Sequence, residues 1–314
     1  MPPKILVISG PTASGKTRLA VELALRHGGE VVSADSMQVY RRMDIGTAKP
    51  TPEEMRGIPH HMLDVADPEE DFSVARYVEL AAPCVDDILA RGKLPIVAGG
   101  TGLYLDSLLS GRTFAPFSPD GGLRARLEAR FDALGGEAML GELAAADPEA
   151  AARLLPNDRK RIVRALEVFQ QTGKTISQHN RETRALPLRY DALTLSLAFQ
   201  RREDMWARID RRVDEMMAAG LAEEVRALLD SGVPVRCTAM QAIGYKEMAA
   251  ALRGGGDVCA AAEEIKLRSR QYAKRQLTWF RRTEGAKWLF WGPEPDFEAA
   301  CRTSTKYLEE FGLV

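Results

Sequence analysis

The feature that most constrains the fold is an octapeptide near the N-terminus, Gly10-Pro11-Thr12-Ala13-Ser14-Gly15-Lys16-Thr17. It matches the phosphate-binding pattern G-x-x-x-x-G-K-[ST]. A short apolar run rich in β-branched residues, 5–9, precedes it, and apolar residues at helical spacing follow it over 15–27. A buried strand, a glycine-rich loop and a helix, in that order, predict an α/β protein that binds a di- or triphosphate.

The rest of the chain shows where the α/β pattern stops and resumes. Runs 30–34 and 94–98 predict further buried strands, and a helix is predicted from Ser73 to Arg91, with Pro83 expected to kink or shorten it. After Gly111 the chain becomes rich in Ala, Leu, Arg and Glu, which predicts helices at 123–134, 136–146 and 158–172. Later elements are predicted as a strand at 193–199, helices at 203–219, 221–231, 241–252 and 257–282, a strand at 287–291 and a helix at 296–311.

This order predicts the fold class and the domains. We expect an α/β fold of the P-loop NTPase type, with a mostly parallel sheet flanked by helices. Residues 1–111 and 192–314 would form this core, and residues 112–191 would form an all-helical insertion.

Polar residues follow two other predicted strands. Asp35 ends the second strand, and Gly99-Gly100-Thr101 follows the third, where many P-loop ATPases carry a Mg²⁺-binding Asp. Since parallel strands end at one crevice, Asp35 should face Lys16 and Thr101. There it could accept a proton from a nucleophile or bind Mg²⁺, but a simple Asx turn explains it equally well.

Charge is balanced overall and concentrated locally. The chain has 43 basic and 44 acidic residues, so nucleic-acid binding would need local patches. Residues 265–282 hold seven basic residues and no acid, interleaved with Tyr272 and Trp279; a second cluster comprises Arg159, Lys160, Arg161 and Arg164. These are either solvated faces or a clamp on a polyanion.

Apolar runs, cysteines and histidines indicate the compartment in which the protein works and whether it binds a metal. No apolar run approaches the roughly 18 residues of a membrane helix, so we expect no membrane contact. The four cysteines are far apart in sequence and are expected to be reduced, cytoplasmic thiols. The four histidines show no metal-ligand spacing.

Several segments together resemble one family. The phosphate loop is followed by Asp35-Ser36-Met37-Gln38-Val39-Tyr40, by DIGTAKP at 44–50 and by GGTGLY at 99–104. Further along are PND at 156–158, Arg161, RALEV at 164–168, QAIGYK at 241–246 and KRQLTWFR at 274–281. This combination, spread over about residues 4–292, resembles the tRNA dimethylallyltransferase family, also called the tRNA isopentenyltransferase family.

The resemblance implies an activity and a set of site residues. The activity is transfer of a dimethylallyl group from dimethylallyl diphosphate to the exocyclic amine of the adenosine just 3′ of the anticodon. Catalytic roles are implied for Asp35, Thr101 and Lys16, diphosphate binding for residues 10–17 and Arg202, and Mg²⁺ binding for Thr17. Contacts with tRNA are implied for Asp35, Ser36, Met37, Gln38, Thr101, Arg124, Lys160, Arg161, Arg164, Gln241, Gly244, Tyr245, Lys274, Arg275, Trp279 and Arg281. Gln38 would help read the base, and we expect a monomer.

Three other functions fit parts of the pattern. A small-molecule or nucleoside kinase would use the same loop but would need no basic surfaces. A nucleic-acid-binding ATPase is disfavoured by the missing acid after the third strand. A non-catalytic RNA-binding scaffold would leave the combination of Lys16 and Asp35 unexplained.

Overall fold

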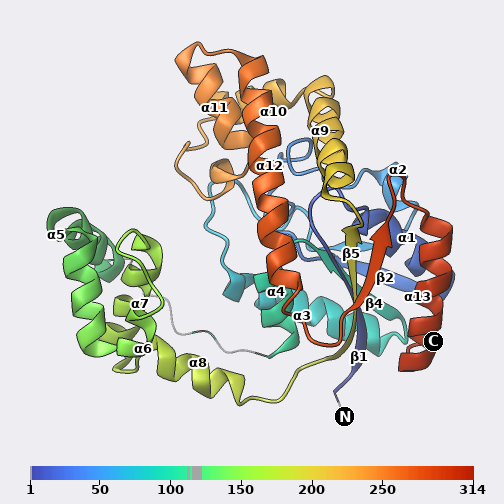
Figure 1. Ribbon diagram of the computed structural model, residues 1–314, viewed down its shortest axis with the longest axis horizontal. Helices are drawn as coiled ribbons and strands as arrows, with labels where there is room; N and C mark the ends of the chain where they lie inside the picture. Colours follow the sequence, from blue (N-terminus) through green and yellow to red (C-terminus); the bar gives the residue numbers. More distant parts are fainter. Residues whose placement is uncertain (1, 112–113, 115–121) are drawn as a thin grey trace. The chain divides into compact units, whose positions relative to one another are not determined.

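The computed structural model describes residues 2–111, 114 and 122–314, and its centre is a single parallel sheet (Figure 1). The strand order is β3-β2-β4-β1-β5-β6. The strands are β1 (Lys4–Ser9), β2 (Gly29–Ser33), β3 (His60–His61), β4 (Leu94–Gly99), β5 (Asp191–Phe199) and β6 (Lys287–Trp291). Every pairing is parallel, which confirms the predicted P-loop type of α/β fold.

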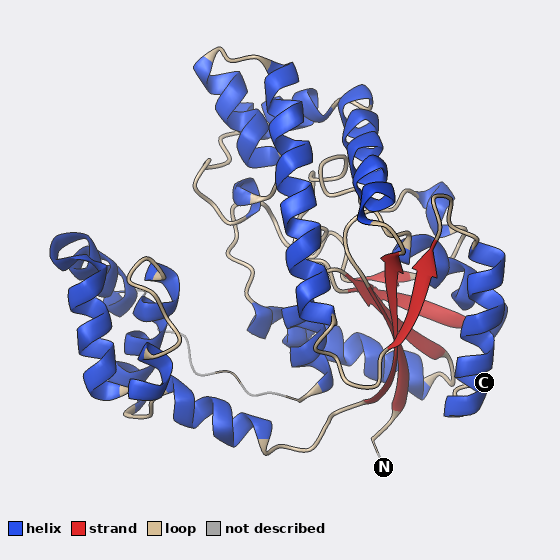
Figure 2. Cartoon of the chain, viewed as in Figure 1, coloured by secondary structure: helices blue, strands red, loops and turns tan. Residues whose placement is uncertain are grey.

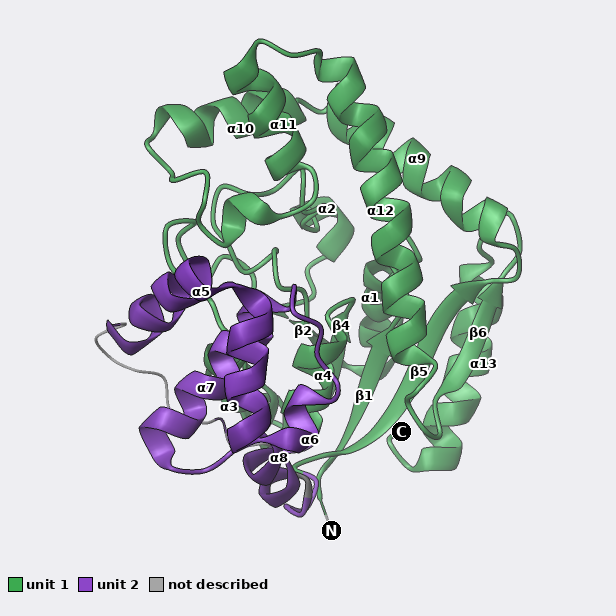
Figure 3. Ribbon diagram, turned by 60° about the vertical axis from the view of Figure 1, so that its left-hand side comes forward, with its two compact units in different colours: residues 1–109, 189–314 green, residues 110–188 purple. Residues whose placement is uncertain are grey.

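Contacts between residues divide the chain into two units, 1–109 with 189–314, and 110–188 (Figure 3). Helices of the first unit are α1 (Lys16–His27), α2 (Pro52–Met55), α3 (Val74–Ala90), α4 (Gly102–Leu109), α9 (Arg202–Ala218), α10 (Leu221–Asp230), the 3₁₀ turn η1 (Ala239–Gln241), α11 (Tyr245–Gly254), α12 (Val258–Phe280) and α13 (Phe297–Phe311). Helices of the second unit are α5 (Gly122–Ala146), α6 (Pro148–Ala151), α7 (Arg159–Thr172) and α8 (Ile176–Arg184).

The alternation of side chains along β1 gives the first unit two hydrophobic cores. Figure 2 shows the helices (blue) that flank the strands of the sheet (red). Ile5 and Val7 point to the face covered by α3 and α4, whereas Leu6 and Ile8 point to the face covered by α1 and α13. All four side chains are at most 1% exposed. A strand that is apolar on both faces is the pattern of a central strand in a doubly covered parallel sheet.

The second unit is helical and has a core of its own. Leu127 and Met139 of α5 pack with Ile162 and Leu166 of α7. Gly135 has non-helical angles and divides α5 at the place where the sequence predicted two helices. The second unit begins at 110 and ends at 188, compared with the predicted 112 and 191, and residue 112 lies outside the described residues.

Some local predictions were wrong. Pro83 does not shorten α3, because it lies on the exposed side of a helix whose other face buries Tyr77, Ala81 and Val85. The helix predicted at 241–252 starts only at Tyr245, since Gly244 has a φ of 100°. Short elements that were not predicted are α2, β3, α4, α6, α8 and η1.

No helix within the described residues is long and apolar enough to cross a bilayer.

Candidate active site

The phosphate loop, residues 10–17, connects β1 to α1 at the carboxyl edge of the sheet. Gly15 directly precedes α1 and has a φ of 82°, a left-handed conformation that glycine adopts at little cost. A Cβ atom at this position would lie 2.7 Å from the Phe297 ring. Both constraints favour glycine at the turn that aims the N-terminus of α1, with its positive dipole end, at the space above the sheet.

Two side chains from late in the chain hold the backbone of the phosphate loop. Trp291 donates from Nε1 to the carbonyl of Ser14 at 2.8 Å. Arg208 donates from Nε to the carbonyl of Ala13 at 3.0 Å. These contacts fix the backbone of the loop, so that the amides at its C-terminal end, where α1 begins, are held in place for an anion.

Gln276 of α12 joins the phosphate loop to the segment after β4. Its Oε1 accepts from the amide of Thr12 at 2.9 Å, and its Nε2 donates to the carbonyl of Gly100 at 2.9 Å. The next residue, Thr101, accepts at Oγ1 from the amide of Ser36 at 3.0 Å. The loops that follow β1, β2 and β4 are therefore linked by hydrogen bonds at one edge of the sheet.

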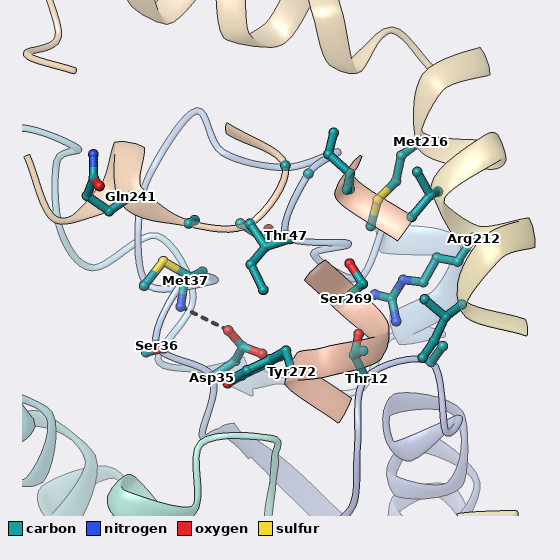
Figure 4. Close-up of a pocket in the computed structure, with 18 of the residues that line it drawn as sticks. Thr12, Asp35, Ser36, Met37, Thr47, Arg212, Met216, Gln241, Ser269 and Tyr272 are labelled. Atoms are coloured by element: carbon teal, nitrogen blue, oxygen red, sulfur yellow. Dashed lines mark hydrogen bonds between the residues drawn. The ribbon is translucent and has the colours of Figure 1, made fainter. Parts of the chain in front are cut away.

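Two adjoining cavities open at this edge, with volumes of about 310 and about 680 Å³. Both are lined by Thr12, Ala13, Asp35, Thr47, Arg212, Met216 and Tyr272. The larger cavity adds residues 14–17 of the phosphate loop and further charged residues. Its cations, Lys16, Arg18, Lys49, Arg208 and Arg211, outnumber the acids that it adds, Asp44, Glu54 and Glu215. The smaller cavity, shown in Figure 4, adds mainly apolar ones, Met37, Ile209, Val213, Ile243 and Ile265. A cationic compartment and an apolar compartment thus meet beside Asp35.

Lys16 and Arg212 are the cations nearest to this meeting point. Burial lowers the pKa of Lys16 to about 8, although the negative charge of Asp35 acts in the opposite direction. Burial likewise lowers the pKa of Arg212, again opposed by Asp35. The Arg212 guanidinium has no hydrogen-bond or ion-pair partner within the described part of the chain, and it projects into the smaller cavity (Figure 4). Such a group is well suited to receive a phosphate oxygen.

The structure does not bring Arg202 into either cavity. Its side chain is 72% exposed, its Nε donates to Glu203 at 3.1 Å, and its guanidinium lies 5.0 Å from the centre of the Trp206 ring. The arginines of α9 that line the larger cavity are instead Arg208, Arg211 and Arg212, about two to three turns further on. Their spacing of three and four residues in the sequence was the signal that could have identified them.

Asp35 combines the two roles that the sequence left open. Its Oδ1 accepts from the amide of Met37 at 2.9 Å and from that of Gln38 at 3.4 Å, which is an Asx turn (Figure 4). Its Oδ2 has no hydrogen-bond partner within the described residues, and the carboxylate lines both cavities. One oxygen therefore shapes the turn, and the other is available to a ligand.

Gln38 lines the larger cavity, and its side-chain amide is engaged within the protein. Its Oε1 accepts from Ser33 at 3.1 Å, and its Nε2 donates to the carbonyls of Thr47 and Ala48 at 3.3 and 3.0 Å. Both ends of the amide are thus used within the protein. Gln38 connects β2 to the segment 44–49, and pairing with a base would require these bonds to break.

The basic helix α12 has two different halves. In its first half Lys266 pairs with Asp214 at 2.7 Å, Arg268 with Glu264 at 2.6 Å and Arg270 with Asp210 at 3.3 Å. Four cations at and after its second half, Lys274, Arg275, Arg281 and Arg282, are exposed and form no ion pair within the described residues. Acidic residues just before residue 265 and on α9 therefore balance the positive charge of the first half of α12 only.

The other expected RNA contacts of the first unit differ in exposure. Gln241, Gly244 and Arg275 line the smaller cavity. Trp279 is 39% exposed and donates from Nε1 to Asp106 at 3.1 Å. Tyr245 is fully buried, so it contributes to packing in this structure and not to an exposed surface.

In the second unit, the expected RNA contacts also form two groups. Lys160 and Arg161 are exposed. Arg124 and Arg164 instead donate to the carboxylate of Glu167, which is fully buried, at 2.8 and 2.7 Å. Because an unpaired buried carboxylate is costly, these two arginines contribute to the fold of the helical unit.

The fold and the cavities together define a P-loop α/β protein whose site can hold a phosphorylated ligand beside a carboxylate. The IPP transferase family model matches residues 38–283, and that of isopentenyl transferase matches residues 3–70. The chain belongs to the IPP transferase family.

Named relatives and solved structures agree with this assignment. The chain is 45% identical to the tRNA dimethylallyltransferase of Acetivibrio thermocellus, and the match covers 98% of both chains. It is 50% identical to tRNA dimethylallyltransferase 1 of Trichlorobacter lovleyi, and this match covers 92% of this chain and 94% of that one. The tRNA isopentenylpyrophosphate transferase of Bacillus halodurans superposes with a TM-score of 0.73 at 41% identity, covering 98% and 96% of the two chains. A eukaryotic dimethylallyltransferase acting on tRNA superposes with a TM-score of 0.82 at 30% identity, covering 98% of this chain and 78% of that one.

The first prediction contrasts two arginines of α9. Because Arg212 lines both cavities and has no hydrogen-bond or ion-pair partner among the described residues, Arg212→Gln should weaken binding of an alkyl diphosphate by about 10- to 100-fold, the usual value of a hydrogen bond to a charged group. Arg202→Gln is the matched control and should leave affinity unchanged. Calorimetric titration of both variants, each checked for an unchanged melting temperature, makes the comparison. A larger loss for Arg202→Gln would assign the diphosphate to the residue expected from the sequence.

The second prediction concerns pH. With a pKa of about 8, Lys16 is charged below pH 8 in the free protein and loses its proton above it. An alkyl diphosphate is fully ionised well below that pH, since phosphate esters have a last pKa of about 6. Affinity should therefore be constant from about pH 7 to pH 8, between the two pKa values, and fall towards tenfold per pH unit above pH 8. Lys16→Arg stays charged throughout and should remove this dependence. A wild-type affinity that stays constant well above pH 8 would contradict the lowered pKa.

Proposed function

We propose that this chain transfers a dimethylallyl group from dimethylallyl diphosphate to the exocyclic amine of the adenosine immediately 3′ of the anticodon in tRNA, releasing diphosphate. The observation that carries the proposal is the meeting of a cationic phosphate site and an unpartnered carboxylate oxygen at Asp35. The names of the relatives supply the transferred dimethylallyl group and tRNA as the molecule acted on. The proposal includes action as a monomer in the cytoplasm, where tRNA is used.

The cationic compartment would hold the leaving group. As the bond between C1 of the allyl group and its oxygen breaks, the electron pair leaves with the diphosphate. The phosphate-loop amides, Lys16, Arg208 and Arg212 would stabilise that developing charge in a partly dehydrated site. The apolar walls of the smaller cavity would accommodate the hydrocarbon part of the donor.

Asp35 would act on the acceptor. An adenine amine is a weak nucleophile because its lone pair is delocalised into the ring, so it gains from losing a proton as the new N–C bond forms. The Oδ2 atom of Asp35 would accept that proton, while Oδ1 remains in the turn. Thr101, fixed by the amide of Ser36, lies at the same edge of the sheet. The adenosine would have to leave its stack to reach this depth.

The residues present fit a Mg²⁺ ion that arrives with the diphosphate. Thr17 lines the larger cavity and offers a hydroxyl ligand. The described residues contain no cluster of three or more His, Cys, Asp or Glu side chains able to hold a metal ion by themselves. Mg²⁺ commonly takes few protein ligands and completes its shell with phosphate oxygens and water. When bound, it would neutralise part of the diphosphate charge.

The direct test is incubation of the chain with dimethylallyl diphosphate and an unmodified tRNA anticodon stem-loop, followed by nucleoside mass spectrometry. We expect dimethylallyl adenosine at the position 3′ of the anticodon. Hydrolysis of ATP stimulated by tRNA, without prenyl transfer, would favour a nucleic-acid-binding ATPase instead.

The third prediction tests Asp35 as a base. Asp35→Asn keeps the shape and the oxygen in the turn but removes the basicity. Turnover should fall by roughly 10²- to 10⁴-fold, while affinity for the stem-loop changes little. Single-turnover kinetics and a binding titration separate these two quantities. If turnover stays within a few-fold of wild type, the carboxylate only shapes the turn.

The fourth prediction uses the two halves of α12. The unpaired Arg281 is expected to contact phosphate, so Arg281→Ala should make the log–log slope of tRNA affinity against salt shallower by about 0.7–0.9. Arg268→Ala, in the paired half, is the matched control and should leave the slope unchanged. Equal slopes for wild type and Arg281→Ala would identify this end of the helix as a solvated face.

A further inference from the structure

The segment 44–49, which we call the wall loop, forms part of both cavities. Gly46 and Thr47 line the smaller cavity, and Asp44, Ile45, Thr47, Ala48 and Lys49 line the larger one. The Thr47 hydroxyl donates to the carbonyl of Met43 at 2.7 Å, which leaves its methyl group for the cavity. Figure 4 shows this side chain pointing toward Asp35 from the opposite wall. The wall loop therefore stands close to the place where the bond would be made.

The carboxylate of one residue outside the wall loop fixes the amides of the loop. The carboxylate of Glu224, in the first turns of α10, accepts hydrogen bonds from three successive amides. Its Oε2 accepts from Asp44 and Ile45, both at 2.8 Å, and its Oε1 accepts from Gly46 at 3.1 Å. Three consecutive amides around one anion form a nest, an arrangement that strongly restricts the backbone.

Tyr245 supports the same contact from α11. Its hydroxyl donates to Oε1 of Glu224 at 2.5 Å, and burial raises its pKa, so it stays a donor at ordinary pH. Its ring packs directly under the wall loop, because a Cβ atom at Gly46 would lie 2.5 Å from it. The absence of a side chain at Gly46 thus lets the loop descend onto Tyr245.

The carbonyls of the wall loop are held separately. Gln38 donates to the carbonyls of Thr47 and Ala48. Lys49, with a side chain only 6% exposed, pairs with Asp44 and Asp64 at 2.6 Å each. Removing Glu224 would therefore release the amide side of the loop without removing every other attachment.

We propose that Glu224 is a positioning residue that keeps the wall loop closed over the reaction centre, and that it thereby directs the dimethylallyl group to the amine of adenosine and not to water. The inference rests on the proposed function and adds a role for a residue that does not line either cavity. Its basis is the four hydrogen bonds that converge on one carboxylate behind the wall.

The competing reaction is simple hydrolysis. The bond between C1 and the diphosphate oxygen breaks, the electron pair leaves with diphosphate, and a water oxygen forms the new bond to C1. The water loses a proton to the solution, and dimethylallyl alcohol results. An allylic carbon that has begun to lose its leaving group reacts readily with any nucleophile nearby, so exclusion of water decides the product.

The fifth prediction is a change in stoichiometry. The wild type should release one diphosphate for each adenosine prenylated. Glu224→Gln keeps the size of the side chain but replaces one accepting oxygen by an NH₂ group, which cannot accept a hydrogen bond from the amides of the wall loop. The loop should therefore open, and the ratio of diphosphate released to adenosine prenylated should rise several-fold. The neighbouring Glu223→Gln is the matched control, because Glu223 is exposed and forms its ion pair with Arg226 of the same helix, at 3.8 Å. A mere loss of folded enzyme lowers both products equally and leaves the ratio at one.

Gly46→Ala provides an independent variant if Glu224→Gln folds poorly. Its methyl group would push the wall loop away from Tyr245 without altering Glu224, and it too should raise the ratio. Diphosphate release and nucleoside mass spectrometry in the same reaction give the measurement. A ratio of one in both variants, with the wild type active, would overturn the inference alone. Absence of prenyl transfer by the wild type would overturn the proposed function and the inference with it.

Discussion

The site depends above all on how the backbone of the phosphate loop is held. A glycine-rich loop is useful to an anion only while its amides keep one arrangement, since each reorganised amide costs part of the binding energy. Here the loop lies near the start of the chain, but the side chains that fix it come from α9, α12 and β6. The site is therefore complete only when elements more than 190 residues away have packed against it.

That dependence explains which parts were predictable from the sequence. The phosphate loop and Asp35 lie beside strands with strong apolar runs, and parallel topology alone brings them to one edge. The position of Arg202 could not be judged in the same way. Whether a residue on α9 faces the cavity or solvent depends on the rotation of that helix against β5, and nearly three helical turns separate Arg202 from Arg212.

Hydrogen-bond partners were the other limit. Sequence shows that Gln38 and Arg164 are polar, but it does not show that an internal carbonyl or a buried carboxylate already uses them. The same holds for α12, where the acids that offset Lys266 and Arg270 include residues of α9. Local composition therefore overstated the free positive charge of the first half of this helix and described the second half correctly.

The attachment of the helical unit has a consequence for how such proteins change over time. The amide of Arg189 donates to the carbonyl of Leu109 at 2.9 Å, so the chain leaves the α/β unit and re-enters it at adjacent points. None of the residues that line the two cavities lies between these points. Because the helical unit 110–188 leaves and re-enters the α/β unit at adjacent points, a change in its length or sequence need not move a strand of the sheet. The described lining of both cavities would keep the same residues if the inserted segment changed.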